Sequence, residues 1–374
     1  MRIVIISTAY PLRGGIAHYV SLLQKHLSVR HEVSVITFKR QYPKLLFPGK
    51  SQEEIGASSP SLSSIQVIDT LNPITWYKAG RIAAGMKPDL IIFKYWMPFF
   101  APAFGIAARV AKRNSGCKVL FICDNVIPHE HTPLDRVLTS WLLKAGDYFI
   151  VQSKAVEQDL LSVVEEPKYA FVPHPIYEIF GTTLEKEKAR AGLGIGRDEK
   201  VALFFGYVRK YKGLHVLLDA MKMVLARITV KLLVVGEFYD DENTYQKQIE
   251  NLDLGKNVIC ISSYVPNNEV AKYFSAADVV VLPYVDATQS GIVQIAYNFG
   301  KPVITTEVGG LAEVVVPEKT GLVVQPNSPA QLADAIVRFF EEGLADRFSR
   351  EIVAQRKLYS WDTLVNAIEG LVKA

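Results

Sequence analysis

The sequence predicts an α/β protein with two domains, each built on a parallel sheet. Short runs rich in β-branched residues recur along the chain, and most are followed by a glycine- or proline-containing loop and an amphipathic helix. This alternation begins at residues 3–8 and starts again at residues 201–205. A chain of 374 residues is also too long for one ordinary core, so two domains are expected.

The composition indicates a globular protein, because 49% of the residues are apolar. The formal net charge is only +4, and the Lys and Arg residues are scattered among Asp and Glu, so no charge stripe points to nucleic acid. Three cysteines show neither a disulfide framework nor a metal-binding spacing, which favours a reducing cytoplasm. The longest apolar run is shorter than the roughly 20 residues of a membrane span. The N-terminus lacks the cleavage site of a signal peptide. We therefore expect a cytoplasmic protein, with contact to the inner face of the membrane left open.

The first half reads as strands and helices in alternation. Strands are predicted at residues 3–8, 32–38, 89–93, 119–123 and 147–151, and helices at residues 101–112 and 134–144. Residues 39–50 form a predicted loop with four cations, Tyr42 and Phe47. This mixture suits a loop that contacts an acceptor or a membrane, and it equally suits a solvated loop. The stiff segment Pro173-His174-Pro175 marks the predicted domain boundary.

Candidate functional residues of the first half follow two of its strands. Gly14 and Gly15 follow the first strand and allow a ligand close approach to the backbone, unless they form a simple tight turn. Asp124 and His129 follow the strand at residues 119–123, where titratable side chains are candidates for a reaction centre. A histidine in a loop is often a surface or capping group, so both interpretations of His129 stay open.

The second half places cations directly after a strand. The strand at residues 201–205 ends in Gly206, and Arg209 and Lys212 lie on the loop that leads through Gly213 into a helix. Cations on a strand-to-helix loop are poised for a phosphate and are not needed for packing. The two glycines that bracket them make a merely solvated loop the weaker interpretation.

A second predicted anion site follows the strand at residues 279–282. The helix that opens at Gly291 presents unpaired N–H groups and a partial positive charge at its start. The alternative is that residues 288–290 only cap this helix. The candidate ligand-binding residues of this half are Asp286, Thr288, Gln289, Ser290, Gly291 and Ile292, together with Gly206, Glu237, Tyr264 and Val265 at the ends of neighbouring strands. No metal site is expected, because Asp240-Asp241-Glu242 reads as a solvated turn and the chain has no Asp-x-Asp.

Taken together, these segments resemble the retaining glycosyltransferases of family four, the glycosyl transferases group 1. The resemblance spans almost the whole chain, and the order and spacing of its motifs are specific although no single motif is. The motifs are Gly14-Gly15, Phe-Gly-Tyr-Val-Arg-Lys-Tyr-Lys-Gly at residues 205–213, Thr-Gln-Ser-Gly at residues 288–291, Gly-Lys-Pro-Val-Ile at residues 300–304, Gly-Gly-Leu-Ala-Glu-Val-Val at residues 309–315 and Lys-Thr-Gly-Leu at residues 319–322.

The resemblance implies a GT-B fold, with two facing Rossmann-like domains, parallel sheets and an interdomain cleft. Residues 1–174, joined by the last helix at about 358–374, would hold the acceptor, and residues 175–357 would hold a nucleotide-diphospho-sugar. That donor is a substrate, so no cofactor is expected. The expected acceptor is a glycan, a lipid-linked glycan or a small molecule, as in the synthesis of cell-envelope polysaccharides.

The family also implies roles for the candidate residues. Arg209 and Lys212 would bind the donor diphosphate and stabilise the charge that grows on it as the glycosidic bond breaks. Gly14 and Gly15 would approach the diphosphate from the other domain. Asp124 or His129 would contact a sugar hydroxyl.

Two departures from the family pattern keep alternatives open. Most relatives carry Glu-x7-Glu, whose second Glu holds the ribose, where this chain has Ala287 and Ile295. Asp286, Gln289 and Gln294 are the candidates to replace that contact. Relatives also often have a pocket His at the position of Asp124-Asn125. A nucleotide-sugar epimerase of the same fold and a non-catalytic sugar- or nucleotide-binding protein are therefore the alternative functions.

Overall fold

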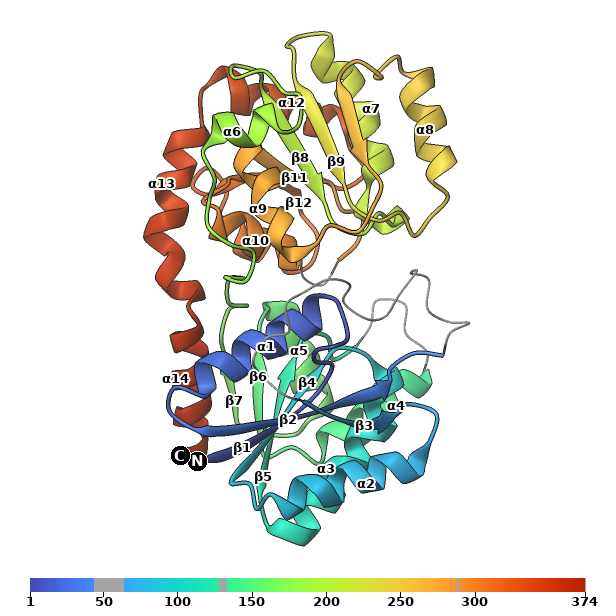
Figure 1. Ribbon diagram of the computed structural model, residues 1–374, viewed down its shortest axis with the longest axis vertical. Coiled ribbons are helices and arrows are strands. Elements are labelled where there is room, and N and C mark those ends of the chain that lie inside the picture. The colour runs from blue at the N-terminus through green and yellow to red at the C-terminus, as the bar shows by residue number, and fades with distance from the viewer. Residues whose placement is uncertain (44–63, 128–132, 288–289, 374) are drawn as a thin grey trace. The chain divides into compact units, whose positions relative to one another are not determined.

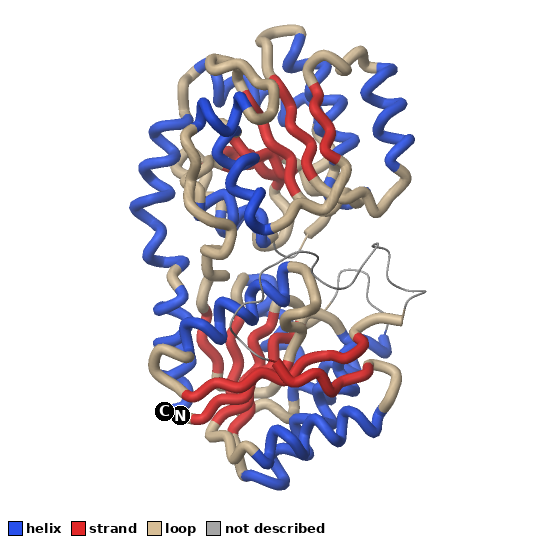
Figure 2. The backbone as a smooth tube through the Cα atoms, in the orientation of Figure 1, coloured by secondary structure: helices blue, strands red, loops and turns tan. Residues whose placement is uncertain are grey.

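The computed structural model describes residues 1–43, 64–127, 133–287 and 290–373. The chain divides into two compact units, of which the first contains Met1–Pro175 and Tyr359–Ala374 and the second contains Ile176–Leu358. Each unit has its own parallel sheet with helices packed on it (Figure 1), and Figure 2 shows the strands of the two sheets in red. Among the helices within the described ranges, none combines the length and the apolar character needed to cross a membrane.

The first unit contains a seven-stranded parallel sheet in the order β3-β2-β1-β4-β5-β6-β7. Its strands are β1 (Arg2–Ile6), β2 (Glu32–Arg40), β3 (Ser64–Asp69), β4 (Leu90–Tyr95), β5 (Lys118–Cys123), β6 (Tyr148–Val151) and β7 (Tyr169–Phe171). Its helices are α1 (Gly15–Leu27), α2 (Pro73–Gly85), η2 (Pro98–Phe100), α3 (Ala101–Ser115), α4 (Pro133–Leu143), α5 (Lys154–Val163) and α14 (Trp361–Lys373).

Both faces of this sheet are covered, which explains why its strands are apolar at successive positions. One core packs alternate side chains of the strands, such as Ile91 and Phe93, against α2, α3, α4 and α5. Lys94 points to the opposite face, where its ammonium lies over the ring of Tyr19 on α1. On that face Tyr19 also contacts Trp361, so α1 and α14 pack together.

The second unit contains a six-stranded parallel sheet in the order β10-β9-β8-β11-β12-β13. Its strands are β8 (Val201–Phe205), β9 (Lys231–Val235), β10 (Val258–Ile261), β11 (Val279–Leu282), β12 (Val303–Thr306) and β13 (Gly321–Val324). Its helices are α6 (Lys186–Ala191), η3 (Lys210–Lys212), α7 (Leu214–Leu225), α8 (Glu242–Asn251), α9 (Asn267–Ala276), α10 (Gly291–Asn298), α11 (Leu311–Val314), α12 (Pro329–Glu341) and α13 (Ala345–Gln355), and η4 (Arg356–Tyr359) spans the boundary to the first unit.

Each sheet has one point where the strand order reverses. In the second unit the chain runs from β8 outward to β10 and then returns to the other side of β8 as β11. In the first unit the reversal lies between β1 and β4. Ligands of open α/β sheets bind outside the carboxyl ends of the strands at such a reversal. The loops after β8 and β11 are therefore the first place to look for a site in the second unit.

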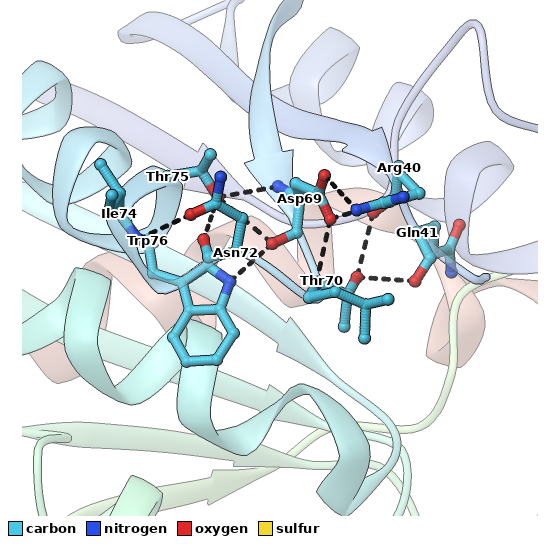
Figure 3. Close-up of polar contacts among 9 residues, drawn as sticks. Arg40, Gln41, Asp69, Thr70, Asn72, Ile74, Thr75 and Trp76 are labelled. Carbon is cyan, nitrogen blue, oxygen red and sulfur yellow. Dashed lines mark hydrogen bonds and ion pairs between the residues drawn. The ribbon is translucent and has the colours of Figure 1, made fainter.

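The predicted α/β architecture with parallel sheets is confirmed, while three local expectations were wrong or incomplete. The prediction began a loop at Lys39, but β2 continues through Arg40, whose guanidinium forms two hydrogen bonds with Asp69 on β3, at 2.9 and 2.6 Å. Neither β3 nor α2 was predicted from the sequence. The start of α2 is anchored by the Asn72 cap on Ile74 and by the bond from Trp76 Nε1 to the Asp69 carbonyl (Figure 3). The third departure concerns Lys94, because the strand predicted at residues 89–93 continues through Lys94 and ends at Tyr95.

Candidate functional site

Two glycines let the loops after β8 and β9 pack backbone to backbone. Gly206 and Gly236 have φ values of +108° and +146°, and a Cβ on Gly236 would lie 2.0 Å from the Gly206 carbonyl oxygen. A side chain at either position would be strained, and one at Gly236 would also clash. Beyond the strands, Val208 N donates to the Glu237 carbonyl at 2.9 Å. This pairing extends past the ends of β8 and β9 and fixes the position at which Arg209 leaves the sheet.

The turn η3 directs Lys212 toward the strand reversal. Lys212 N donates to the Arg209 carbonyl and Gly213 N to the Lys210 carbonyl, at 2.9 and 3.0 Å, which closes the turn. Gly213 has φ +71°, and a Cβ there would lie 1.9 Å from the carbonyl oxygen of Pro283, which follows β11. Only glycine permits this close approach, so the loops after β8 and β11 are in direct contact.

Lys212 is the central side chain of the site. It is only 8% exposed, and its Nζ lies 5.5 Å from the centre of the Tyr284 ring. A Cβ built on Gly206 would lie 3.2 Å from this Nζ and 3.3 Å from Ile292 Cδ1, so these three residues converge. Burial lowers the pKa of Lys212, and within the described part of the chain no carboxylate pairs with it. An ammonium that is buried without a counter-charge is unfavourable, so the site is suited to an anion.

Arg209 supplies a second cation on the same loop. Its guanidinium carbon lies 4.9 Å from the centre of the Tyr239 ring, and the Arg209 residue is half-buried. A guanidinium over an aromatic face keeps its in-plane N–H donors for hydrogen bonds to oxygen atoms. Arg209 and Lys212 together therefore provide donors and positive charge for an anion with several oxygens.

The start of α10 lies beside Lys212. Ser290 caps the helix, because its Oγ accepts a bond from Ile292 N at 3.3 Å. The hydroxyl of Tyr284 lies 3.2 Å from the same Oγ, and burial raises the pKa of Tyr284 to about 12. Tyr284 thus keeps its proton at neutral pH. The structure brings Ser290 and Ile292 to the site of Gly206 and Lys212, and the cap and the predicted anion contact are both compatible with this geometry.

The other predicted residues of the second unit have different environments. Glu237 and Val265 are buried, Tyr264 is half-buried on the loop between β10 and α9, and Asp286 is exposed. A Cβ on Gly291 would lie 3.0 Å from Tyr177 Cε2. Thr288, Gln289 and, in the first unit, His129 lie outside the described residues.

The acidic pair of the family pattern is replaced by buried apolar side chains. Ala287 and Ile295 are 8% and 6% exposed. The neighbouring Gln294 on α10 is also buried, and its Oε1 has no hydrogen-bond partner within the described ranges. A buried amide oxygen without a donor is unfavourable, so Gln294 has an acceptor available for a ligand hydroxyl.

In the first unit, Gly14 precedes α1 with φ +111°, and a Cβ there would meet no atom within 4 Å. Backbone conformation, and not crowding, therefore favours glycine at this position. Gly15 is the exposed first residue of α1.

Asp124 belongs to a buried polar cluster that was not predicted from the sequence. Lys94, on β4, contacts Asp124 Oδ1 and donates to Gln152 Oε1 at 2.8 Å, and its Nζ lies 3.7 Å from the centre of the Tyr19 ring. Burial raises the pKa of Asp124 and lowers the pKa of Lys94, and the attraction between them opposes both shifts. The predicted strand ended before Lys94, because an ionisable side chain is rarely buried without a partner. That partner comes from the neighbouring strand, and only the fold shows it.

His174, at the end of the first unit, makes stability depend on pH. Burial lowers its pKa to about 3, against 6.5 for an exposed histidine. Between these values the unfolded chain binds a proton that the folded chain does not, so the free energy of unfolding falls as pH falls, by up to about 1.4 kcal/mol per pH unit. We expect the variant His174→Gln, which keeps a donor for the Pro175 carbonyl, to reduce this dependence. Urea denaturation at about pH 7 and about pH 5 gives the free energy of unfolding at each pH. An equal loss of this free energy between the two pH values in wild type and variant would contradict the assignment.

Within the described ranges, no three His, Cys, Asp or Glu side chains are grouped so that they could hold a metal ion.

Known proteins are similar to this chain over different lengths. The family model described as "Glycosyl transferases group 1" matches residues 185–354, which contain the Lys212 site. A D-inositol 3-phosphate glycosyltransferase of Acidothermus cellulolyticus is 28% identical over 96% of this chain and 85% of its own. Sucrose-phosphate synthase of Thermosynechococcus elongatus has a similar structure, with a TM-score of 0.78, 20% identity and coverage of 100% of this chain and 98% of its own. HepE of Anabaena in complex with UDP has a TM-score of 0.76 and 18% identity, and both chains are covered completely.

Proposed function

We propose that this glycosyltransferase with a GT-B fold, whose residues 185–354 match the glycosyl transferases group 1 model, uses a nucleotide-diphospho-sugar as donor. In this proposal it transfers a hexosyl group to an acceptor hydroxyl with retention of the anomeric configuration. The single observation that carries the proposal is the buried ammonium of Lys212, which has no described counter-charge and lies beside Gly206 and the start of α10. A diphosphate supplies the missing negative charge.

The residues of the second unit would act on the leaving group. As the bond between the anomeric carbon and the phosphate oxygen breaks, negative charge grows on the nucleoside diphosphate. Lys212 and Arg209 stabilise this charge, and the first amides of α10 add the smaller contribution of a helix start. The acceptor hydroxyl oxygen forms the new bond to the anomeric carbon, and its proton passes to the departing phosphate. No metal ion is needed in this scheme, because the side-chain cations neutralise the diphosphate.

The proposed ribose and acceptor contacts follow from the polar groups that individual side chains offer. We assign the ribose hydroxyls to Gln294, because its buried Oε1 is an acceptor without a partner in the described structure. We assign the acceptor to the first unit, where Asp124 presents a carboxylate that is 16% exposed. A UDP-sugar is the first donor to test, since a protein of similar fold binds UDP. The acceptor would be a glycan, a lipid-linked glycan or a small molecule, and the three free cysteines fit a cytoplasmic enzyme.

A screen of nucleotide sugars tests the proposal. The purified protein is incubated with UDP-, GDP-, ADP- and TDP-linked hexoses, with and without candidate acceptors, and mass spectrometry follows release of the nucleoside diphosphate. We expect release from one donor class, slow without acceptor and faster with it. Failure to bind or cleave any donor would contradict the proposal.

The same screen separates the two alternative functions. An isomerised donor that forms without acceptor would identify an epimerase. Tight nucleotide binding without turnover on any acceptor would identify a binding protein, which the replacement of the acidic pair by Ala287 and Ile295 makes worth testing.

A further inference from the structure

The outer face of α2, α3 and α4 in the first unit combines exposed apolar side chains with positive charge. Helix α3 contacts α2 on one side and α4 on the other, so the three form one layer on the sheet (Figure 1). Two side-chain contacts tie the layer together. Arg81 on α2 donates to Asn114 Oδ1 on α3, and the guanidinium of Arg109 on α3 lies 4.0 Å from the centre of the Trp141 ring on α4.

Five large apolar side chains of this layer are exposed. On α4, Leu134 and Val137 are 62% and 64% exposed and Trp141 is 37% exposed, and their spacing places them on one side of the helix. On α2, Ile74 and Tyr77 are 76% and 53% exposed. Single exposed apolar residues are normal, but the stripe of Leu134, Val137 and Trp141 on one side of α4 marks an interaction surface, and Ile74 and Tyr77 add exposed apolar area on α2.

The same layer concentrates the positive charge of the chain. Helices α2 and α3 carry five cations and no Asp or Glu, and α4 adds Arg136 and Asp135. The three helices therefore have a net charge of +5, whereas the whole chain has only +4. The exposed cations of the layer and the turn after it are Lys78, Arg81, Arg113, Arg136 and Lys144.

We propose that this α2–α4 face docks on a lipid bilayer with anionic headgroups. Apolar side chains with Tyr and Trp among them suit the boundary between headgroups and acyl chains, and the surrounding lysines and arginines attract anionic lipids. A second copy of the chain would set like charges against each other, and a nucleic acid would leave Leu134 and Val137 without an apolar partner. The inference does not rest on the proposed function, although docking on a bilayer would favour a lipid-linked glycan among the three proposed acceptors.

Vesicle sedimentation tests the docking surface. The full chain is mixed with vesicles of phosphatidylcholine alone or with vesicles that also contain phosphatidylglycerol. We expect binding to the anionic vesicles, weakening as salt is raised, and little binding to the neutral ones. The double variant Leu134→Ser/Val137→Ser should lower the affinity for anionic vesicles about tenfold or more, because it removes apolar area that enters the bilayer.

The second unit offers a matched control. Leu358 and Val353 are 59% and 60% exposed, close to the values of Leu134 and Val137, and they lie in η4 and α13. The variant Leu358→Ser/Val353→Ser should bind vesicles like the wild type. Equal binding to both lipid compositions, an equal loss in the control variant, or no binding at all would overturn the proposal. Self-association that Leu134→Ser/Val137→Ser abolishes would show a protein interface and would overturn it as well.

Donor cleavage without vesicles separates this inference from the proposed function. The variant Leu134→Ser/Val137→Ser should release nucleoside diphosphate from the donor at the wild-type rate, because the α2–α4 face lies outside the catalytic groups. Cleavage by a protein that binds no vesicles would reject the docking surface alone, and vesicle binding without any cleavage would reject the proposed function alone.

Discussion

Replacing Lys212 by methionine is expected to slow turnover at least about 100-fold and to leave the protein as stable as the wild type or more stable. The two effects have opposite signs because the ammonium is buried without a described counter-charge. Removing it relieves a desolvation penalty in the free protein, and methionine fills much the same volume. The same change removes a donor and a charge that the leaving diphosphate needs. Thermal unfolding without ligand and steady-state turnover measure the two effects on one preparation.

Variants of the same loop provide the controls. Lys210→Met changes an exposed cation two residues away and should alter neither quantity. Arg209→Ala should abolish measurable turnover, because it removes the guanidinium that would bind the diphosphate. The protein should stay folded, because this side chain is half-buried and lies on a loop. A stability loss in Lys212→Met with full turnover would show that Lys212 is structural and would contradict its role in the site.

Breaking the pair of Lys94 and Asp124 is expected to cause the largest loss of stability in the first unit. Lys94→Met or Asp124→Asn leaves the partner buried without its counter-charge, which costs roughly 3 to 5 kcal/mol in other buried pairs. The double variant Lys94→Met/Asp124→Asn removes both charges, so it should recover most of that free energy. If Asp124 also contacts substrate, the double variant stays inactive although it is folded.

Urea denaturation of the two single variants and the double variant gives the coupling free energy of the pair. Additive losses would mean that the two groups do not depend on each other. Recovery of both stability and turnover in the double variant would show that Asp124 only balances the charge of Lys94, and it would remove Asp124 from the candidate site.

Some features of the candidate site depend on local sequence pattern, and others depend on contacts between distant segments. The position of Arg209 and Lys212 on a loop directly after β8 could be predicted, because glycines bracket the cations after an apolar strand, and their contact with a donor stays a prediction. The burial of Lys212 could not, because it depends on Tyr284 and Ile292, which reach it from beyond another strand of the sheet. Local pattern identifies which residues follow a strand, but the environment of their side chains is set by contacts between distant segments.

In the first unit, too, contacts between distant segments explain which features could not be predicted. Lys94 was missed because a lysine normally ends a buried strand, and its partners Asp124 and Gln152 come from two other strand ends. Helix α2 was not predicted because its glycines and small residues give a weak helical pattern, while its start is fixed by contacts with β3. The expected membrane-contacting loop lies largely outside the described residues, and the exposed apolar and cationic side chains of α2, α3 and α4 were not recognised as one surface.

Calorimetric titration of UDP and the other nucleoside diphosphates into wild type and Lys212→Met measures whether Lys212 binds a diphosphate. We expect one diphosphate to bind the wild type and Lys212→Met to weaken this binding at least about tenfold, since a charge-assisted hydrogen bond contributes roughly 1.5 to 3 kcal/mol. Lys210→Met should bind the same nucleotide like the wild type. Equal affinity of the wild type and Lys212→Met would contradict a diphosphate site at Lys212.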